Sequence, residues 1–299
     1  MTENNQNNPG RLIKNVTYGG DPEFYVMNKL TGEIVSGIGY VGGEKSEPLI
    51  LDENTGITRT EDNVLFEAQF PPVTCVEDWC KMYKIIQEKG NELLSEYDMQ
   101  LVTGSSHIFP DEQLTHPSAR MFGCSASMNA YTREIQYTCG PEEAGNLRSC
   151  GSHYHVGTTD DINEEDVFNL MKVFDLFLGV PSVLIDQDKQ RRQLYGKAGE
   201  CRMRVIGNAV VMEYRTLGGN MLADEELIRW TYTQMEAAIE FFNRGNFDEL
   251  FASENDIVDC INNCDEQLAQ TLVQKFGIEY PNIQVDAGYV IFHSNKQYA

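Results

Sequence analysis

The sequence has little positive charge and no apolar stretch long enough to cross a bilayer. Its 299 residues carry 23 Lys and Arg against 46 Asp and Glu, which gives a formal net charge of −23 at pH 7. Such an acidic chain repels both nucleic acid and anionic membranes. No apolar run approaches the roughly 20 residues that a membrane-spanning helix needs. We therefore expect neither nucleic acid nor a membrane as partner.

The sequence also lacks a secretory signal and a cysteine spacing typical of metal sites. Its first ten residues are rich in asparagine and contain no apolar segment of the kind found in signal peptides. None of the eight cysteines stands in a CxxC pair. We expect these cysteines to be reduced thiols in a cytoplasmic protein.

Four strand-like segments each carry two polar side chains that are two residues apart. Because residues i and i+2 of a strand point to the same face, each pair presents both side chains on one side of a sheet. Their neighbours are apolar or aromatic, and a buried charge is costly unless it is paired or holds a metal. The pattern therefore indicates a catalytic face. The pairs are Asp21 with Glu23, Glu67 with Gln69, His153 with His155, and Glu213 with Arg215.

Each pair taken alone has a simpler interpretation. A His-x-His pair on a strand is more often hydrogen-bonded than metal-binding, and Glu213 with Arg215 is also typical of a structural ion pair. Asp21 and Glu23 follow two glycines, which favours a turn. Pro22 between them limits any strand there to its start or to a sheet edge. The presence of all four pairs in one chain favours the catalytic interpretation.

Basic residues concentrate in one short segment of this acidic chain. Four arginines lie within fourteen residues, and they are Arg191, Arg192, Arg202 and Arg204. The cluster indicates a specific anion, and phosphate is the obvious candidate because guanidinium groups bind it bidentately. A solvated basic loop is an equally good interpretation of the cluster alone.

Hydrophobic periodicity predicts strands separated by long helices. Apolar stripes at helical spacing predict helices at 76–97, 164–184, 223–242 and 256–276. Asn163 before three acidic residues is a good N-cap, and Pro181 should bend or end that helix. Extended segments are expected at 17–26, 32–40, 63–70, 99–107, 133–137, 152–159, 202–205, 210–216 and 288–293. This order predicts an α+β fold, with helices packed on one face of a largely antiparallel sheet.

The same pattern suggests how the chain is divided. Residues 1–14 are expected to form a flexible tail, and 15–299 a single domain with a helical C-terminal part. Residues 37–60 are rich in turn residues and are expected to form a loop or a hairpin insertion.

The order of the motifs resembles a known superfamily. An acidic pair opens the first strand, and a Glu strand ends in Pro71-Pro72. Then come Gly-Ser-His-x-His-Val-Gly, the Arg-rich loop and Glu-x-Arg. This order resembles the carboxylate–amine ligases, which include glutamine synthetase and the glutamate–cysteine ligases. More closely, the chain resembles the phage-encoded COOH–NH2 ligase (amidoligase) family, as do its segments Gly42-Gly43-x-Lys45 and Gly123-Cys124-Ser125.

The resemblance implies a fold and a set of site residues. The fold is a curved, glutamine-synthetase-like antiparallel sheet with helices on its outer face, whose concave face binds ATP and Mg²⁺ or Mn²⁺. The positions that match metal ligands are Asp21, Glu23, Glu67, His153 and Glu213. The positions assigned to the nucleotide phosphates are His155, Arg191, Arg192, Arg202 and Arg204. The catalytic roles fall to Arg202, which stabilises charge in phosphoryl transfer, and to Arg215, which holds a substrate carboxylate.

The implied reaction forms an amide or isopeptide bond between a carboxylate and an amine. It proceeds through an acyl phosphate and releases ADP and phosphate. The two partners are carried by small molecules, a peptide or a protein side chain. The expected location is the cytoplasm, that of the host if a phage encodes the chain.

Two alternatives stay open. One is a zinc hydrolase that uses His153, His155 and a Glu, although zinc favours nitrogen and sulfur over the carboxylates of this face. The other is a non-catalytic phage protein on a ligase fold. Two positions also depart from the family pattern. Asp21 stands where many relatives have Glu, and Val211 stands where glutamine synthetase has an arginine.

Overall fold

The sheet is organised around β1 (Val16–Asn28), which changes its partners midway along its length. The first part of β1 pairs antiparallel with β5 (Leu65–Val73) on one side and with β11 (Ser152–Thr158) on the other. Its last part pairs with β6 (Met99–Thr103) and β2 (Ile34–Val35). One strand therefore joins both halves of the sheet.

The computed structural model describes residues 12–121, 126–136 and 141–291. The expectations for residues 1–11, for Gly123-Cys124-Ser125 and for the end of the predicted strand 288–293 lie outside this range.

Further strands extend the sheet to 12 strands, and the described strands pair antiparallel throughout. Beyond β5 lie β4 (Ile57–Asp62) and β3 (Leu49–Asp52). Beyond β11 the order is β13 (Ala209–Tyr214), β12 (Glu200–Ile206), β8 (Ser127–Asn129) and β9 (Ile135–Gln136). Off this path, β14 (Val290–Ile291) pairs with β6, and β7 (Ser106–Ile108) pairs separately with β10 (Leu147–Ser149).

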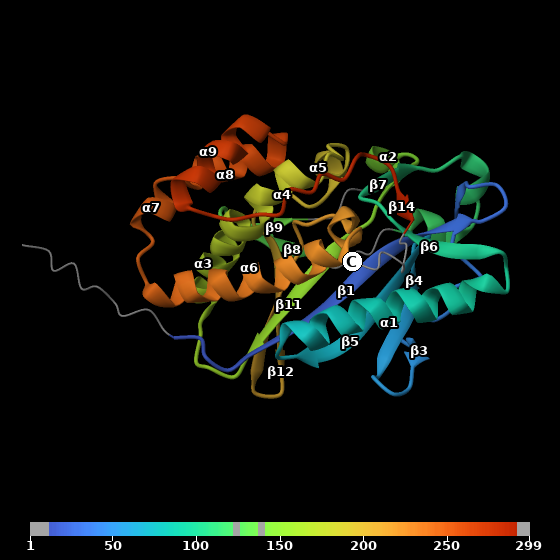
Figure 1. Ribbon diagram of the computed structural model, residues 1–299, viewed down its shortest axis with the longest axis horizontal. Helices are drawn as coiled ribbons and strands as arrows, with labels where there is room; N and C mark the ends of the chain where they lie inside the picture. The colour runs from blue at the N-terminus through green and yellow to red at the C-terminus, as the bar shows by residue number, and fades with distance from the viewer. Residues whose placement is uncertain (1–11, 122–125, 137–140, 292–299) are drawn as a thin grey trace, which may run out of the picture.

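Helices cover one face of this sheet (Figure 1). α1 (Val76–Ser95) and α6 (Glu225–Arg244) lie side by side across β5, β1 and β11. Behind α6 runs a continuous helical segment of α3 (Glu164–Phe174), η3 (Asp175–Gly179) and α4 (Val180–Ile185). Outside it pack α7 (Asp248–Phe251), α8 (Glu254–Asn263) and α9 (Glu266–Phe276). The remaining turns are η1 (Asp111–Leu114), η2 (Pro117–Arg120), α2 (Pro141–Ala144), α5 (Arg191–Leu194) and η4 (Gly219–Leu222). The predicted α+β class and antiparallel sheet are confirmed.

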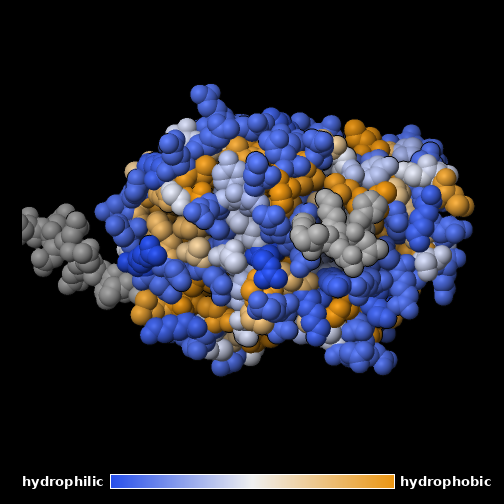
Figure 2. Space-filling model, viewed as in Figure 1, coloured by the Kyte–Doolittle hydropathy of each residue, from blue (hydrophilic) through white to orange (hydrophobic). Residues whose placement is uncertain are grey.

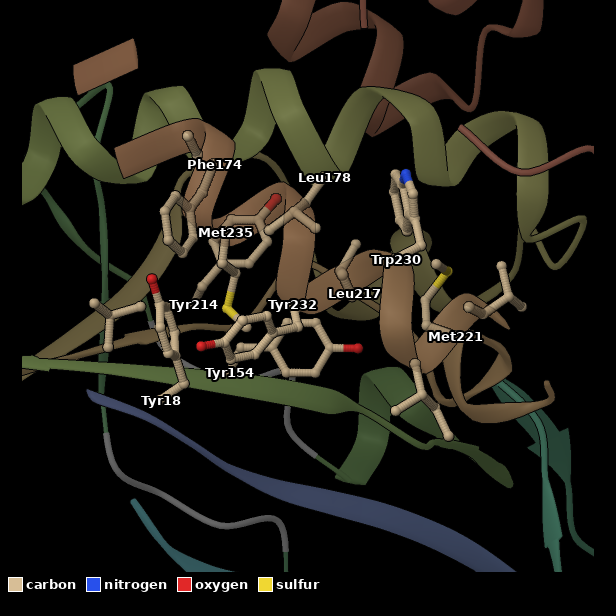
Figure 3. Close-up of a cluster of buried hydrophobic side chains, with 14 of the residues drawn as sticks. Tyr18, Tyr154, Phe174, Leu178, Tyr214, Leu217, Met221, Trp230, Tyr232 and Met235 are labelled. Atoms are coloured by element: carbon tan, nitrogen blue, oxygen red, sulfur yellow. The ribbon is translucent and has the colours of Figure 1, made fainter. Parts of the chain in front are cut away.

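Aromatic side chains fill the space between sheet and helices (Figure 3). Tyr18 of β1 lies with its ring centroid 4.7 Å from that of Tyr232 on α6. Tyr214 of β13 packs in the same way on Phe174 of α3, at 5.6 Å. Edge-to-face contacts of this kind add to the large apolar area that aromatic residues bury. Because strand side chains alternate between faces, the residues next to these tyrosines point away from the helices.

The helix predicted at 164–184 forms from Glu164 to Ile185, whereas the one predicted at 256–276 is divided. Asn163 caps α3 as expected, in a reciprocal capping box with Asp166. Pro181 does not end the helix, which continues to Ile185 through a π-turn at η3. The π-turn places Pro181 in the first turn of α4, where a missing N–H is tolerated. The predicted helix 256–276 is divided into α8 and α9, because Cys264 is left-handed (φ 53°) and Asp265 caps α9.

Two strand expectations and the expected tail also change. Pro22 lies inside β1, at its last pair with β11, where the strand exchanges partners and a missing donor is tolerated. The predicted strand 99–107 is split into β6 and β7. The expected tail ends before residue 14, because Ile13 is buried and its N–H donates to Asn243 Oδ1 over 2.8 Å. The expected loop or hairpin insertion at 37–60 is a hairpin of β3 and β4, and β4 runs two residues further, to Asp62.

Within the described residues, the segment Glu164–Ile185 is long and apolar enough to cross a membrane, by its length and composition. However, 89% of its most apolar stretch is buried inside the protein, as in a core helix. Hydrophilic side chains dominate the helical face of the molecule, with smaller hydrophobic patches between them (Figure 2). The cysteines of the described range are free thiols, as predicted: Cys75, Cys80, Cys150, Cys201, Cys260 and Cys264.

Candidate functional site

Strand register brings most of the proposed site residues together on the sheet face that the helices leave uncovered. Residues directly opposite each other on neighbouring strands project to the same face. The opposed pairs are Glu67 with Glu23, Asp21 with His153, His155 with Glu213, and Glu213 with Arg202. A continuous band of charged and imidazole side chains therefore runs from β5 through β1, β11 and β13 to β12.

One group of possible metal ligands consists of Asp21, His155 and Glu213, whose ligand atoms lie within 4.8 Å of one another. Asp21 Oδ1 lies 3.3 Å from His155 Nε2. It is buried and makes no hydrogen bond of normal geometry. Burial alone would raise the pKa of Asp21 and lower that of His155, but their mutual attraction outweighs burial. The pKa of Asp21 therefore lies well below its usual range and that of His155 lies above its ordinary value.

A second group consists of Glu23, Asp62 and Glu67, whose oxygen atoms also lie within 4.8 Å of one another. The Gly151 N–H donates to Glu23 Oε2 over 2.5 Å, which fixes this carboxylate. Lys45 Nζ lies 2.7 Å from Asp62 Oδ2 and 3.5 Å from Glu67 Oε2. Burial and the nearby Asp62 raise the pKa of Glu23 to about 8, and burial with Asp21 raises that of Glu67. The concentrated negative charge would be relieved by a bound cation.

Arginines surround Glu213 at the other end of the band. Arg215 Nη1 contacts Glu213 Oε1 directly, and Arg202 Nη1 lies 3.4 Å from the same oxygen. Arg204 Nη2 is 3.8 Å from Glu213 Oε2, and its side chain is 62% exposed. Burial and Asp21 nevertheless raise the pKa of Glu213 to about 7. Arg215 Nε also lies 3.7 Å from Glu200 Oε1, so this guanidinium is held between two carboxylates.

Arg191 and Arg192 do not join this band, which departs from the expectation for the arginine cluster. Arg191 is 2% exposed and donates to the carbonyl oxygens of Thr216 (2.7 Å) and Arg215 (3.2 Å). Arg192 donates to the Ile261 carbonyl oxygen (3.1 Å) on the helical side. Both guanidinium groups come from the short helix α5 and bind backbone. Their guanidinium groups therefore hold neighbouring backbone in place and are not directed at a ligand.

His153 lies on the expected face beside Asp21 but belongs to neither group of possible metal ligands found among the described residues. Its Nδ1 lies 3.5 Å from Asp21 Oδ1, but His155, not His153, completes the group with Asp21 and Glu213. Burial and the charge of Arg215 lower the pKa of His153 to about 3. A Cβ on Gly151 would lie only 2.4 Å from His153 Nε2, so only glycine leaves room for this ring. His153 is a neutral imidazole that packs tightly beside Asp21 and lines the adjacent pocket.

A pocket opens over the second group, with Arg202 and Arg215 in its lining. Several of its lining residues are absent from the expected set, among them Asp62, Lys45 and Tyr195. The Tyr195 ring faces both Arg191 and Arg215, with centroid distances of 5.3 and 5.2 Å.

A signal for Asp62 was available in the sequence. Asp62 and Leu65 close a tight hairpin around Asn63, whose φ is 59°. Counting back across such a turn from Glu67 places Asp62 on the same face. Lys45 and Tyr195 lie on loops, and no periodic pattern indicates where their side chains point.

The ligand chemistry of both groups suits hard divalent cations. Five of the six side chains are carboxylates and one is an imidazole. Mg²⁺ and Mn²⁺ prefer oxygen ligands, whereas zinc sites are richer in nitrogen and sulfur. Asp21 Oδ1 is buried without a normal hydrogen bond, so this oxygen is free to act as a metal ligand.

No family model matches the sequence, and no curated protein matches it either. Among solved structures, the chain is similar to a glutamine synthetase of Plasmodium falciparum, with a TM-score of 0.36 and 7% identity over 76% of this chain. It covers 52% of that chain, about half its length. It is also similar to GmaS without ligand, with a TM-score of 0.37 and 9% identity, over 90% of this chain and 70% of that one. Both similarities are too faint to assign a family.

Proposed function

We propose that the protein is an ATP-dependent carbon–nitrogen ligase that joins a carboxylate to an amine with Mg²⁺ or Mn²⁺. The observation that carries this proposal is the band on the uncovered sheet face. Two oxygen-rich groups, Asp21–His155–Glu213 and Glu23–Asp62–Glu67, lie at one side, and Arg202, Arg204 and Arg215 lie at the other. Cations beside convergent arginines are what a transferring phosphoryl group needs.

Each group would hold one divalent cation. A bound Mg²⁺ supplies positive charge to phosphate oxygens and orients them. The chain provides the rest by fixing its ligands in advance. The Gly151 N–H holds Glu23, and Gln69 Nε2 donates to Glu67 Oε1 over 3.1 Å. In this arrangement His155 is a metal ligand, and His153 orients Asp21 from beside it on the same face.

The arginines divide into two roles. Arg202 and the more exposed Arg204 would bind the phosphates, because both lie on β12 facing the band. Arg215 would hold the substrate carboxylate while it accepts the phosphoryl group as an acyl phosphate. An amine then attacks the acyl carbon, and phosphate leaves. The overall products are the amide, ADP and phosphate. Arg191 fixes the backbone of Arg215, so it acts by positioning.

The experiment that tests this proposal is a product assay. Purified protein is incubated with ATP, Mg²⁺ and pools of carboxylates and amines, and nucleotides are separated by chromatography. We expect ADP release that depends on both substrates and is lost in Arg202→Ala and Glu67→Gln. Glu88→Gln, an exposed change on α1, serves as the matched control and should leave activity unchanged. Amide formation accompanied by AMP, or zinc-dependent amide hydrolysis without nucleotide, would refute the proposal.

A further inference from the structure

Lys45 lies on a loop whose backbone is hydrogen-bonded to Glu61, and this loop places Lys45 over the carboxylates of Glu23, Asp62 and Glu67. Glu61 Oε1 accepts hydrogen bonds of 2.8 Å from the N–H groups of both Gly39 and Gly42. The Glu61 N–H in turn donates to the Gly43 carbonyl oxygen. Gly43 has φ +87°, and a Cβ there would lie 2.6 Å from the Arg59 carbonyl oxygen. The course of the loop is thus fixed by strand β4, independently of the Lys45 side chain.

The Lys45 ammonium lies where a cation would be expected to lie. It contacts Asp62 Oδ2 and Glu67 Oε2 at 2.7 and 3.5 Å. Its side chain is 52% exposed. The four-carbon stem of lysine is flexible, so the ammonium can swing into solvent while the loop stays in place. A divalent cation bound by the same oxygens, at the 2.0–2.1 Å typical of Mg²⁺, would lie beside this like charge.

We propose that the Lys45 ammonium occupies the Glu23–Asp62–Glu67 group in the metal-free protein and is displaced by a divalent cation. The displaced ammonium then binds the anionic phosphate that accompanies the cation. The displacement of Lys45 involves the cation alone, whereas the contact with phosphate rests on the proposed function. The exchange makes cation binding weak without phosphate and strong with it, which is a coupling between two ligands.

The test uses Lys45→Met, which keeps the length of the stem and removes its charge. Mn²⁺ alone is titrated into the protein, and free Mn²⁺ is measured by electron paramagnetic resonance. We expect one of two Mn²⁺ sites to tighten on the order of tenfold, because a like charge a few ångström away is removed. Lys45→Arg keeps the charge and should bind Mn²⁺ as the wild type does.

Two further variants show where the effect comes from. Lys84→Met changes the net charge equally, but this lysine lies on α1 and its side chain is 69% exposed. It should leave Mn²⁺ affinity unchanged. Asp62→Asn combined with Lys45→Met should abolish the gain, because the tightened site loses a ligand. Equal Mn²⁺ affinity in Lys45→Met and Lys84→Met would overturn the proposal.

A second titration includes a non-hydrolysable ATP analogue. Here the wild type should gain more Mn²⁺ affinity from the analogue than Lys45→Met does, because only the wild type transfers its ammonium to phosphate. If the analogue raised Mn²⁺ affinity equally in the wild type and in Lys45→Met, the proposed contact between Lys45 and phosphate would be overturned. If no ligase activity is found with any substrate, the titration with Mn²⁺ alone still decides the displacement.

Discussion

Arg191 and Arg204 belong to one sequence cluster, yet the structure gives them opposite surroundings, and Arg191→Met tests this difference. Arg191 is 2% exposed, and its guanidinium donates to the Thr216 and Arg215 carbonyl oxygens. Gly196 lies so close that a Cβ there would be 1.6 Å from Arg191 Nη1. Met fills the volume of the stem but donates no hydrogen bond.

The expected loss of stability follows from the Thr216 and Arg215 carbonyl oxygens, which lose their hydrogen-bond donor. A buried carbonyl left without its donor costs roughly 1–3 kcal/mol. Two such carbonyls together predict a loss of about 2–6 kcal/mol for Arg191→Met. This is a large part of the 5–15 kcal/mol that is typical of whole proteins. Arg204→Met, at a side chain 62% exposed, should change stability by about 0.5 kcal/mol or less.

The assay is urea unfolding, followed by the fluorescence of the two tryptophans. Trp79 and Trp230 are both buried, so their emission should shift on unfolding. Arg191→Met should lower the midpoint clearly, and Arg204→Met should not. Nucleotide binding, measured well below the transition, should weaken in Arg204→Met. A wild-type midpoint for Arg191→Met combined with lost nucleotide binding would refute this reasoning, because it would place Arg191 against the ligand.

Three more predictions follow from single contacts. Glu67→Gln should lose one of two Mn²⁺ sites while keeping its unfolding midpoint, as measured by calorimetry and urea. Gly151→Ala should displace the His153 ring, whose Nε2 lies 2.4 Å from the added Cβ, and cost roughly 1–3 kcal/mol. Burial raises the pKa of Asp175 to about 6 from 3.8. The folded protein therefore holds this proton more tightly than the unfolded chain, and stability falls as pH rises through this window. From pH 5 to pH 7 the unfolding free energy should fall by about 1 kcal/mol more in wild type than in Asp175→Asn.

The sequence predicts the paired site residues well because alternation in a strand is a strict geometric property. Asp21 with Glu23, and Glu213 with Arg215, needed only their spacing to be placed on one face. The long helices were predicted for a similar reason, since an apolar stripe at helical spacing specifies the face to be buried.

The sequence does not predict where a side chain points when its direction depends on contacts with distant parts of the chain. Arg192 faces the helical layer because the Ile261 carbonyl oxygen there accepts from it, and that contact spans 69 residues. The order of His153 and His155 relative to Asp21 depends on the stagger between β1 and β11, which periodicity does not reveal. Lys45 reaches Asp62 only because Glu61 binds the glycine loop.

Along each central strand, side chains that pack in the aromatic core alternate with side chains that belong to the candidate site. Tyr154 lies between His153 and His155, and its ring packs 5.5 Å from Trp79 beneath the sheet. Tyr214 lies between Glu213 and Arg215, and its hydroxyl donates to Asp175 over 2.7 Å. A slip of one residue in the pairing of β13 would carry every charged side chain into the aromatic core and every tyrosine into the site. The aromatic core therefore fixes the register on which the charged band depends. Conservative changes to these tyrosines should disturb the band more than changes to exposed charges at its edge.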